Sequence, residues 1–152
     1  MQIHAIAQSL KEITADTPAL ANKFPGGLWF GERAGSDTEE GEGLVPYGLI
    51  DVTEAESEGI SAGVRLVTYD VVLTVVVTQR IQDAGAILET FHQYWDRILV
   101  LPSLTNGARL VGKPHPGASG MTEAPNKQLG KDVIEASTSW TLRLSESYPE
   151  TI

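Results

Sequence analysis

The sequence predicts an α+β domain: an antiparallel or mixed β-sheet with an extended hairpin and two main helices packed on one face. Three observations support this fold class. The run Arg65–Gln79, RLVTYDVVLTVVVTQ, alternates like one β-strand. Two segments repeat apolar residues at helical spacing, and a second alternating run follows them, which gives the order helix, strands, helix, strands.

The long strand is the most informative of these features. At ~3.3 Å per residue it would span about 50 Å, whereas a compact domain of 152 residues has a radius of gyration of about 15 Å. The strand must therefore bend or project from the domain. A projecting strand exposes unpaired backbone groups that can pair with another chain.

Length and composition indicate one folded unit. We expect a single domain over residues 1–147 and a short C-terminal tail over residues 148–152, with 41% hydrophobic residues supplying the core. The apolar runs are shorter than the ~20 residues of a membrane span, and the N-terminal residues lack signal-peptide features. We therefore expect a soluble, unexported protein that makes no membrane contact. The absence of cysteine excludes disulfides, thiolate nucleophiles and cysteine-based zinc sites.

The N-terminal segment predicts two helical pieces. Residues Gln2–Ala15 form an amphipathic helix with one buried stripe, because apolar residues recur every three or four positions. Thr17 is predicted to cap a short second piece, Pro18–Phe24, in which proline takes the first helical position. A first strand, Leu28–Glu32, follows, and the polar segment Gly35–Gly43 is expected to be a loop.

The next two strands predict a hairpin. Val45–Glu56 is the first strand, Ser57–Gly63 supplies the turn, and the long strand returns. One face of the long strand is predicted to face the core: Tyr69, Val71, Leu73, Val75 and Val77. The other face mixes threonine and valine, which suits a subunit or tube interface as well as solvent. Its candidate interface residues are Thr68, Asp70, Val72, Thr74 and Val76.

The second half of the chain gives the strongest helix signal. Asp83–Leu99 carries apolar residues every three or four positions, and Asp83 is its expected N-cap. Ala108–Lys113 should be a short strand and Pro114–Gly130 a second long loop. The last strand, Asp132–Ser145, alternates between an apolar and a polar face.

The negative charge is concentrated in one segment. Nine acidic residues lie between Glu32 and Glu58 against Arg33 alone, so this segment carries −8 of the net charge of −9. Such a surface repels a phosphate backbone, which argues against sequence-specific nucleic-acid binding. Two interpretations remain open: the acids keep an exposed loop solvated, or they orient subunits or line a passage. The candidate loop or lumen residues are Asp37, Glu39, Glu40 and Glu42.

Catalytic motifs are not found in the sequence. His4, His92 and His115 are isolated and stand in no metal-ligand spacing. Asp70 would need a partner such as Arg65, Arg109 or Arg143 if it were buried, and otherwise marks an exposed or interface position. No serine lies in a nucleophile elbow and no phosphate-binding loop is present. The sequence thus predicts no enzyme, no catalytic residue, no metal and no cofactor.

The order of these elements resembles the tail-terminator (tail-completion, minor tail) proteins of long-tailed bacteriophages and prophages. The resemblance covers about Met1 to Ser147 and runs through six segments. They are IHAIAQSLKEI…TPALANKF, the acidic loop, VPYGLIDVTEAE, RLVTYDVVLTVVVT, DAGAILETFHQYWDRIL and GKDVIEASTSWTLRLS. The family has no invariant catalytic motif, and neck or head-tail joining proteins share a similar layout.

The resemblance implies a structural virion protein. Such subunits form a homo-oligomeric ring, typically a hexamer, that caps the tail tube, contacts the tube protein and the head-tail connector, and is assembled in the bacterial cytoplasm. Two alternatives remain: a neck or head-tail joining protein, and a monomeric ligand- or peptide-binding module. A small hydrolase or isomerase that used Asp70 or His92 would require these residues to converge in one pocket.

Overall fold

The computed structural model describes residues 2–24, 27–30, 47–77, 81–94, 101–105, 107–126 and 131–147. In this part of the chain, three helices accompany one mixed, mostly antiparallel sheet of six strands, so the predicted α+β fold class is confirmed. The elements are α1 (Ile3–Asp16), α2 (Pro18–Ala21), β1 (Leu28–Phe30), β2 (Tyr47–Ser61), β3 (Val64–Val77), α3 (Ile81–Gln93), β4 (Arg109–Leu110), β5 (His115–Asn126) and β6 (Lys131–Ser147).

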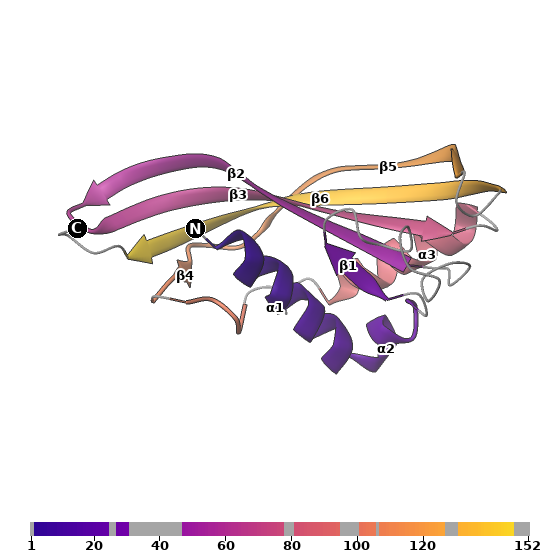
Figure 1. The fold of residues 1–152 in the computed structure, drawn as a ribbon, viewed down its shortest axis with the longest axis horizontal. Coiled ribbons are helices and arrows are strands. Elements are labelled where there is room, and N and C mark those ends of the chain that lie inside the picture. Colours follow the sequence, from indigo (N-terminus) through magenta and orange to yellow (C-terminus); the bar gives the residue numbers. More distant parts are fainter. Residues whose placement is uncertain are drawn as a thin grey trace.

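Strand β6 holds the sheet together. The strand order is β1-β2-β3-β6-β4, and β5 also pairs with β6 (Figure 1). One edge of β6 pairs with all of β3, from Val64 opposite Ser147 to Val77 opposite Ile134. The other edge pairs with β5 and, nearer the C-terminal end of β6, with β4. β1 runs parallel to β2, and the other pairs are antiparallel.

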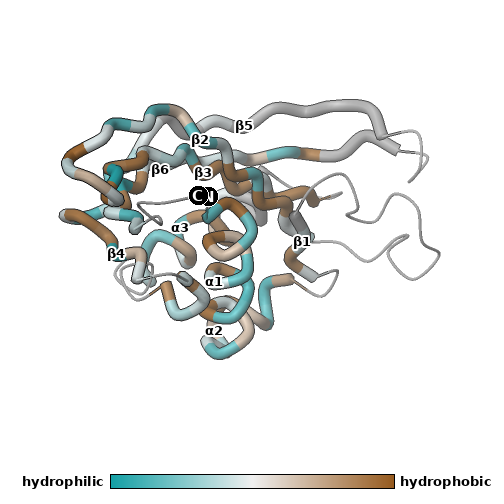
Figure 2. The backbone as a smooth tube through the Cα atoms, turned by 60° about the vertical axis from the view of Figure 1, so that its left-hand side comes forward, coloured by the Kyte–Doolittle hydropathy of each residue, from teal (hydrophilic) through white to brown (hydrophobic). Residues whose placement is uncertain are grey.

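The helices lie on one side of the sheet, and the core fills the space between them (Figures 1 and 2). The centroids of the Phe91 ring on α3 and the Trp140 ring on β6 are 5.5 Å apart, which links helix and sheet at the centre. The buried apolar residues that α1 and α3 supply are Ile6, Ala7, Leu10, Ile87, Leu88 and Phe91. This arrangement confirms the prediction of two main helices on one face.

The predicted core face of the long strand is also confirmed. Its five predicted residues, Tyr69 to Val77 at alternate positions, are at most 2% exposed. The same alternation on β6 buries five residues against the helices: Ala136, Thr138, Trp140, Leu142 and Leu144. Both strands therefore follow the period-two pattern of a sheet with one covered face.

Thr17 occupies the predicted N-cap position but does not cap with its side chain. Its backbone carbonyl accepts the amides of Leu20 and Ala21, each at 2.9 Å, and Pro18 starts α2. The Thr17 hydroxyl is buried and has no hydrogen-bond partner among the described residues. The predicted helical start is confirmed, while the expected side-chain cap is wrong.

We expect Thr17→Val to change the free energy of unfolding by less than about 0.5 kcal/mol or to raise it. The substitution removes a buried hydroxyl that has no hydrogen-bond partner among the described residues. If the hydroxyl capped the helix, its removal would instead lower the free energy of unfolding by about 0.5–2 kcal/mol. Urea unfolding measures the difference. Thr14→Val is the matched control and should lose about 1 kcal/mol, because the Thr14 hydroxyl donates to the Leu10 carbonyl at 2.8 Å.

The predicted hairpin is confirmed, but its turn is much tighter than predicted. β2 continues through the polar residues Ser57, Glu58 and Gly59 to Ser61, so the interpretation of Ser57–Gly63 as the turn is wrong. The connection is Ala62-Gly63, and Gly63 takes a φ of +74°, which a residue without a Cβ adopts easily. Cross-strand pairing with β3 overrides the weak strand propensity of this polar stretch.

The predicted loop over Pro114–Gly130 is wrong for most of its length, because His115–Asn126 forms β5. Its prolines suggested a loop, yet Pro116 pairs opposite Trp140 and Pro125 opposite Asp132. Among the described strands β5 pairs with β6 alone, so it is an edge strand, where a missing backbone N–H is tolerated. A register shift between Pro116 and Ser119 relieves the pairing near the first proline.

The remaining boundaries need smaller corrections. Helix α3 begins at Ile81, so Asp83 lies inside the helix and is not its N-cap. The predicted end of this helix and the predicted loop Gly35–Gly43 lie outside the described residues. β4 is shorter than the predicted strand Ala108–Lys113, whereas the predicted end of the first strand, residues 31–32, lies outside the described residues.

Candidate assembly surface

The face of the sheet opposite the helices, here called the outer face, is polar and built from small side chains. Directly paired residues on antiparallel strands share a face, so each outer residue of β3 defines a row across the sheet. Three central rows consist mainly of threonine, serine, valine and aspartate. They are Thr53-Asp70-Thr141, Asp51-Val72-Ser139 and Leu49-Thr74-Ser137.

The five residues predicted as an interface divide into two groups. Val76 is 1% exposed and packs with Tyr47 in a small cluster against which Trp29 and Leu49 also pack. This valine is therefore covered by its own chain. The other four lie on the outer face: Asp70 is exposed, whereas Thr68, Val72 and Thr74 are half-buried. No helix of the described part covers them (Figure 1).

Asp70 is not a buried carboxylate. It is exposed in the middle of the outer face, and the Thr141 hydroxyl donates to its Oδ1 at 3.2 Å. Among the arginines considered as partners, Arg143 stands in the next row, opposite Thr68, and Arg109 lies on β4. The exposed alternative for Asp70 is thus the one that the structure bears out.

The β2–β3 hairpin extends beyond the part of the sheet that the helices cover (Figure 1). Nine consecutive residues of β2, Thr53–Ser61, are exposed. On its other side β2 meets β1 only at residues Gly48–Ile50. From Asp51 to Ser61 this side of β2, here called the free edge, therefore pairs with no described strand. Unpaired edge groups of this kind are a template for another chain.

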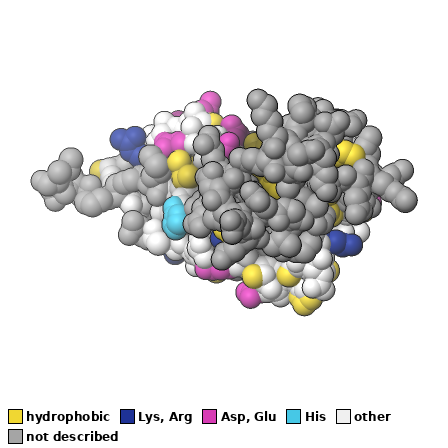
Figure 3. Space-filling view, turned by 45° about the vertical axis from the view of Figure 1, so that its right-hand side comes forward, with side chains coloured by type: hydrophobic (Ala, Val, Ile, Leu, Met, Phe, Trp, Pro, Cys, Tyr) yellow, Lys and Arg dark blue, Asp and Glu magenta, His cyan; other side chains and the backbone are white. Residues whose placement is uncertain are grey.

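Acidic residues follow the free edge. Asp51, Glu54, Glu56 and Glu58 are all exposed. A register shift between Glu54 and Glu56 changes the alternation, so that Glu56 and Glu58 pair with Thr68 and Leu66 of β3. Carboxylates are visible at the surface of the described part in Figure 3. The other predicted acids, Asp37, Glu39, Glu40 and Glu42, lie outside the described residues.

A buried polar network was missed by the sequence reasoning. Glu146 is 2% exposed and accepts a hydrogen bond of 2.7 Å from the Tyr69 hydroxyl. The Tyr69 hydroxyl in turn accepts the backbone amide of Gln2 at 3.0 Å. The Gln2 side chain bonds to Thr105. Glu146 continues the alternation of inward-facing residues on β6. Its place in this alternation is the sequence signal from which its burial could have been predicted.

The residues considered for catalysis do not meet. The ring of His92, on α3, lies 3.1 Å from the hydroxyl of Thr138 on the helix side of the sheet, whereas Asp70 is on the outer face. His4 and His115 are exposed. In the described part of the chain, no group of three or more histidine, aspartate or glutamate side chains could hold a metal ion.

None of the described helices has the length and apolar character needed to cross a membrane. A scan against models of known protein families finds no match, and a search of curated proteins finds no relative of this chain.

Proposed function

We propose that this protein is a structural subunit of a bacteriophage or prophage tail, a tail terminator that assembles into a hexameric ring, caps the tail tube and joins it to the head or neck. The observation that carries the proposal is the projecting β2–β3 hairpin with its free edge and open outer face. A monomeric protein gains nothing from exposing so much strand backbone, whereas an assembling subunit uses it.

The charge of the free edge favours a ring over a twofold dimer. In a twofold dimer the same edge would meet itself, and the acids Asp51, Glu54, Glu56 and Glu58 would face each other. Like charges opposed across a strand pair are destabilising. A contact between two different surfaces avoids this repulsion, and such contacts close into rings.

The outer face suits the same role. Small half-buried side chains such as Val72 and Thr74 make a surface on which another subunit or a tube can pack closely. Capping and joining need no catalytic group, so separation of Asp70 from His92 is compatible with this function.

The proposal predicts a discrete ring in native mass measurements across a concentration series. A hexamer supports it; a monomer at every concentration, even when purified tail tubes are added, contradicts it. Asp70→Arg should convert the ring to smaller species, because it places a bulky cation in the centre of the outer face. The monomer should still fold, because position 70 is exposed in it. The control His4→Arg, at an exposed position on α1, should assemble normally.

A further inference from the structure

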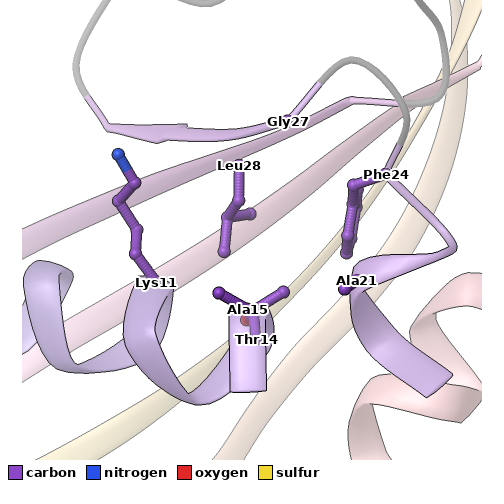
Figure 4. A pocket seen from close by; sticks show the side chains of 7 residues that line it. All are labelled: Lys11, Thr14, Ala15, Ala21, Phe24, Gly27 and Leu28. Atoms are coloured by element: carbon purple, nitrogen blue, oxygen red, sulfur yellow. The ribbon is translucent and has the colours of Figure 1, made fainter. Parts of the chain in front are cut away.

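An apolar pocket of about 200 Å³ lies where the end of α1, α2 and the start of β1 meet (Figure 4). Its walls are mostly hydrocarbon, and of its lining residues Lys11 is charged. The lining residues are Lys11, Thr14, Ala15, Ala21, Phe24, Gly27 and Leu28.

The size of the pocket indicates what it can hold. Sites for drug-sized molecules measure about 300–1,000 Å³, whereas an apolar cavity of about 150 Å³ holds a single benzene-sized group. At about 200 Å³ the pocket fits one apolar side chain better than a cofactor. The occupant should therefore be a protein segment with one protruding apolar residue.

The tip of the β2–β3 hairpin, residues 58–63, presents such a residue. Ile60 is 59% exposed, the most exposed large apolar side chain described. A register shift between Gly59 and Ser61 leaves Ile60 outside the pairing with β3. Irregularities of this kind re-aim a side chain, and here Ile60 is the unpaired residue between the last two pairs of the ladder, Gly59 with Arg65 and Ser61 with Val64.

One molecule cannot bring the two together. The hairpin tip lies at one end of the long axis, and α2 and β1 lie towards the other (Figure 1). The tip can therefore reach the pocket of a second copy but not its own. A contact between two different surfaces repeats from copy to copy and closes into a ring when the rotation allows.

Charge agrees with this pairing. Glu56 and Glu58 are exposed just before Ile60 on the tip side. On the pocket side, Lys11 lines the wall with its ammonium 5.8 Å from the centre of the Trp29 ring, and Lys23 is exposed between the lining residues Ala21 and Phe24. Asp16 is exposed nearby but does not line the pocket. The tip side therefore carries two carboxylates, with Arg65 opposite Gly59, and the pocket side carries two ammonium groups.

We propose that Ile60 of one subunit inserts into the α1–α2–β1 pocket of the next, so that the hairpin tip is the plug and the pocket the socket of a head-to-tail contact between copies of this chain. This inference rests on the proposed ring and names the contact that builds it.

Two blocking variants test the contact. Ile60→Asp removes the plug, and Ala15→Phe fills the socket from an exposed position at the end of α1. Each alone should weaken self-association at least tenfold in native mass or sedimentation measurements. An equal mixture of the two should give a heterodimer and nothing larger, because it retains one intact plug and one intact socket. Val111→Asp, at the other large apolar side chain that is exposed in the described part, is the control and should assemble like the unchanged protein.

Cross-linking identifies the contact directly. The chain contains no cysteine, so in Ile60→Cys combined with Ala15→Cys every disulfide joins two introduced thiols, and the proposed contact brings position 60 of one copy against position 15 of the next. Mild oxidation should give a ladder of linked subunits, whereas each single variant, which can link only like positions, should remain largely unlinked. A wild-type ring whose double variant gives no ladder overturns the plug and socket and leaves the tail-terminator proposal in place. Wild-type monomers at every concentration, with and without tail tubes, overturn both.

Discussion

Trp140→Ala is expected to lower the free energy of unfolding by about 3–5 kcal/mol, the range for removing a buried aromatic side chain. Trp140 is 1% exposed and among the largest fully buried side chains of the described core. It stands on β6 opposite Val71 and meets Phe91 of α3 with 5.5 Å between ring centroids. Its loss leaves a cavity between the central strands and a helix, where the surroundings relax only partly.

Urea unfolding followed by circular dichroism measures this effect. Trp140→Phe should lose less than the alanine variant, because a ring remains against Phe91. Arg143→Ala, at an exposed position three residues along the same strand, is the control and should change stability by less than about 0.5 kcal/mol. A Trp140→Ala variant as stable as this control would show that the helices do not pack on β6 as described.

Tyr69→Phe is expected to lower the free energy of unfolding by about 2–4 kcal/mol, although it removes a single oxygen atom. The Tyr69 hydroxyl donates to the Glu146 carboxylate at 2.7 Å and accepts the Gln2 amide at 3.0 Å. Both partners are buried. Phenylalanine therefore deprives a buried carboxylate of a donor and a buried amide of an acceptor, and each deprived group carries its own desolvation penalty.

A double-mutant cycle with Glu146→Gln tests whether the hydroxyl acts through the carboxylate. In the Glu146→Gln background Tyr69→Phe should cost less, with a coupling energy of about 0.5–3 kcal/mol. Glu58→Gln makes the same chemical change at an exposed residue of β2 and should be nearly neutral. Additive effects of the two substitutions would contradict the described network.

Patterns with a single period were predictable from the sequence. The alternation in β3 and β6 and the three- and four-residue spacing in α1 identified these elements and their buried faces within one or two residues at most ends. Burial decides such patterns, because a shift of one residue would turn the apolar side chains of a strand towards water.

Features that depend on a partner distant in sequence were not predictable. Pro116 and Pro125 suggested a loop, and only their position on an outer strand beside β6 makes a strand possible. The alternation of β6 places Glu146 on the inward face, but no local pattern connects it to the Tyr69 hydroxyl and the Gln2 amide that complete its network. The pocket at α1, α2 and β1 likewise arises from three segments whose packing is a tertiary property.

The position of β6 in the sheet also determines the order in which the domain can form. β6 is the last of the described elements to be synthesised, yet β3, β4 and β5 all pair with it. Until β6 emerges from the ribosome, β3 can pair with β2 alone and has one neighbouring strand in place of two. Pairing across such long sequence separations is intrinsically slow. The newly made chain therefore exposes its most apolar strand before the core can close, and its yield in the cell depends on how well it is protected during that interval.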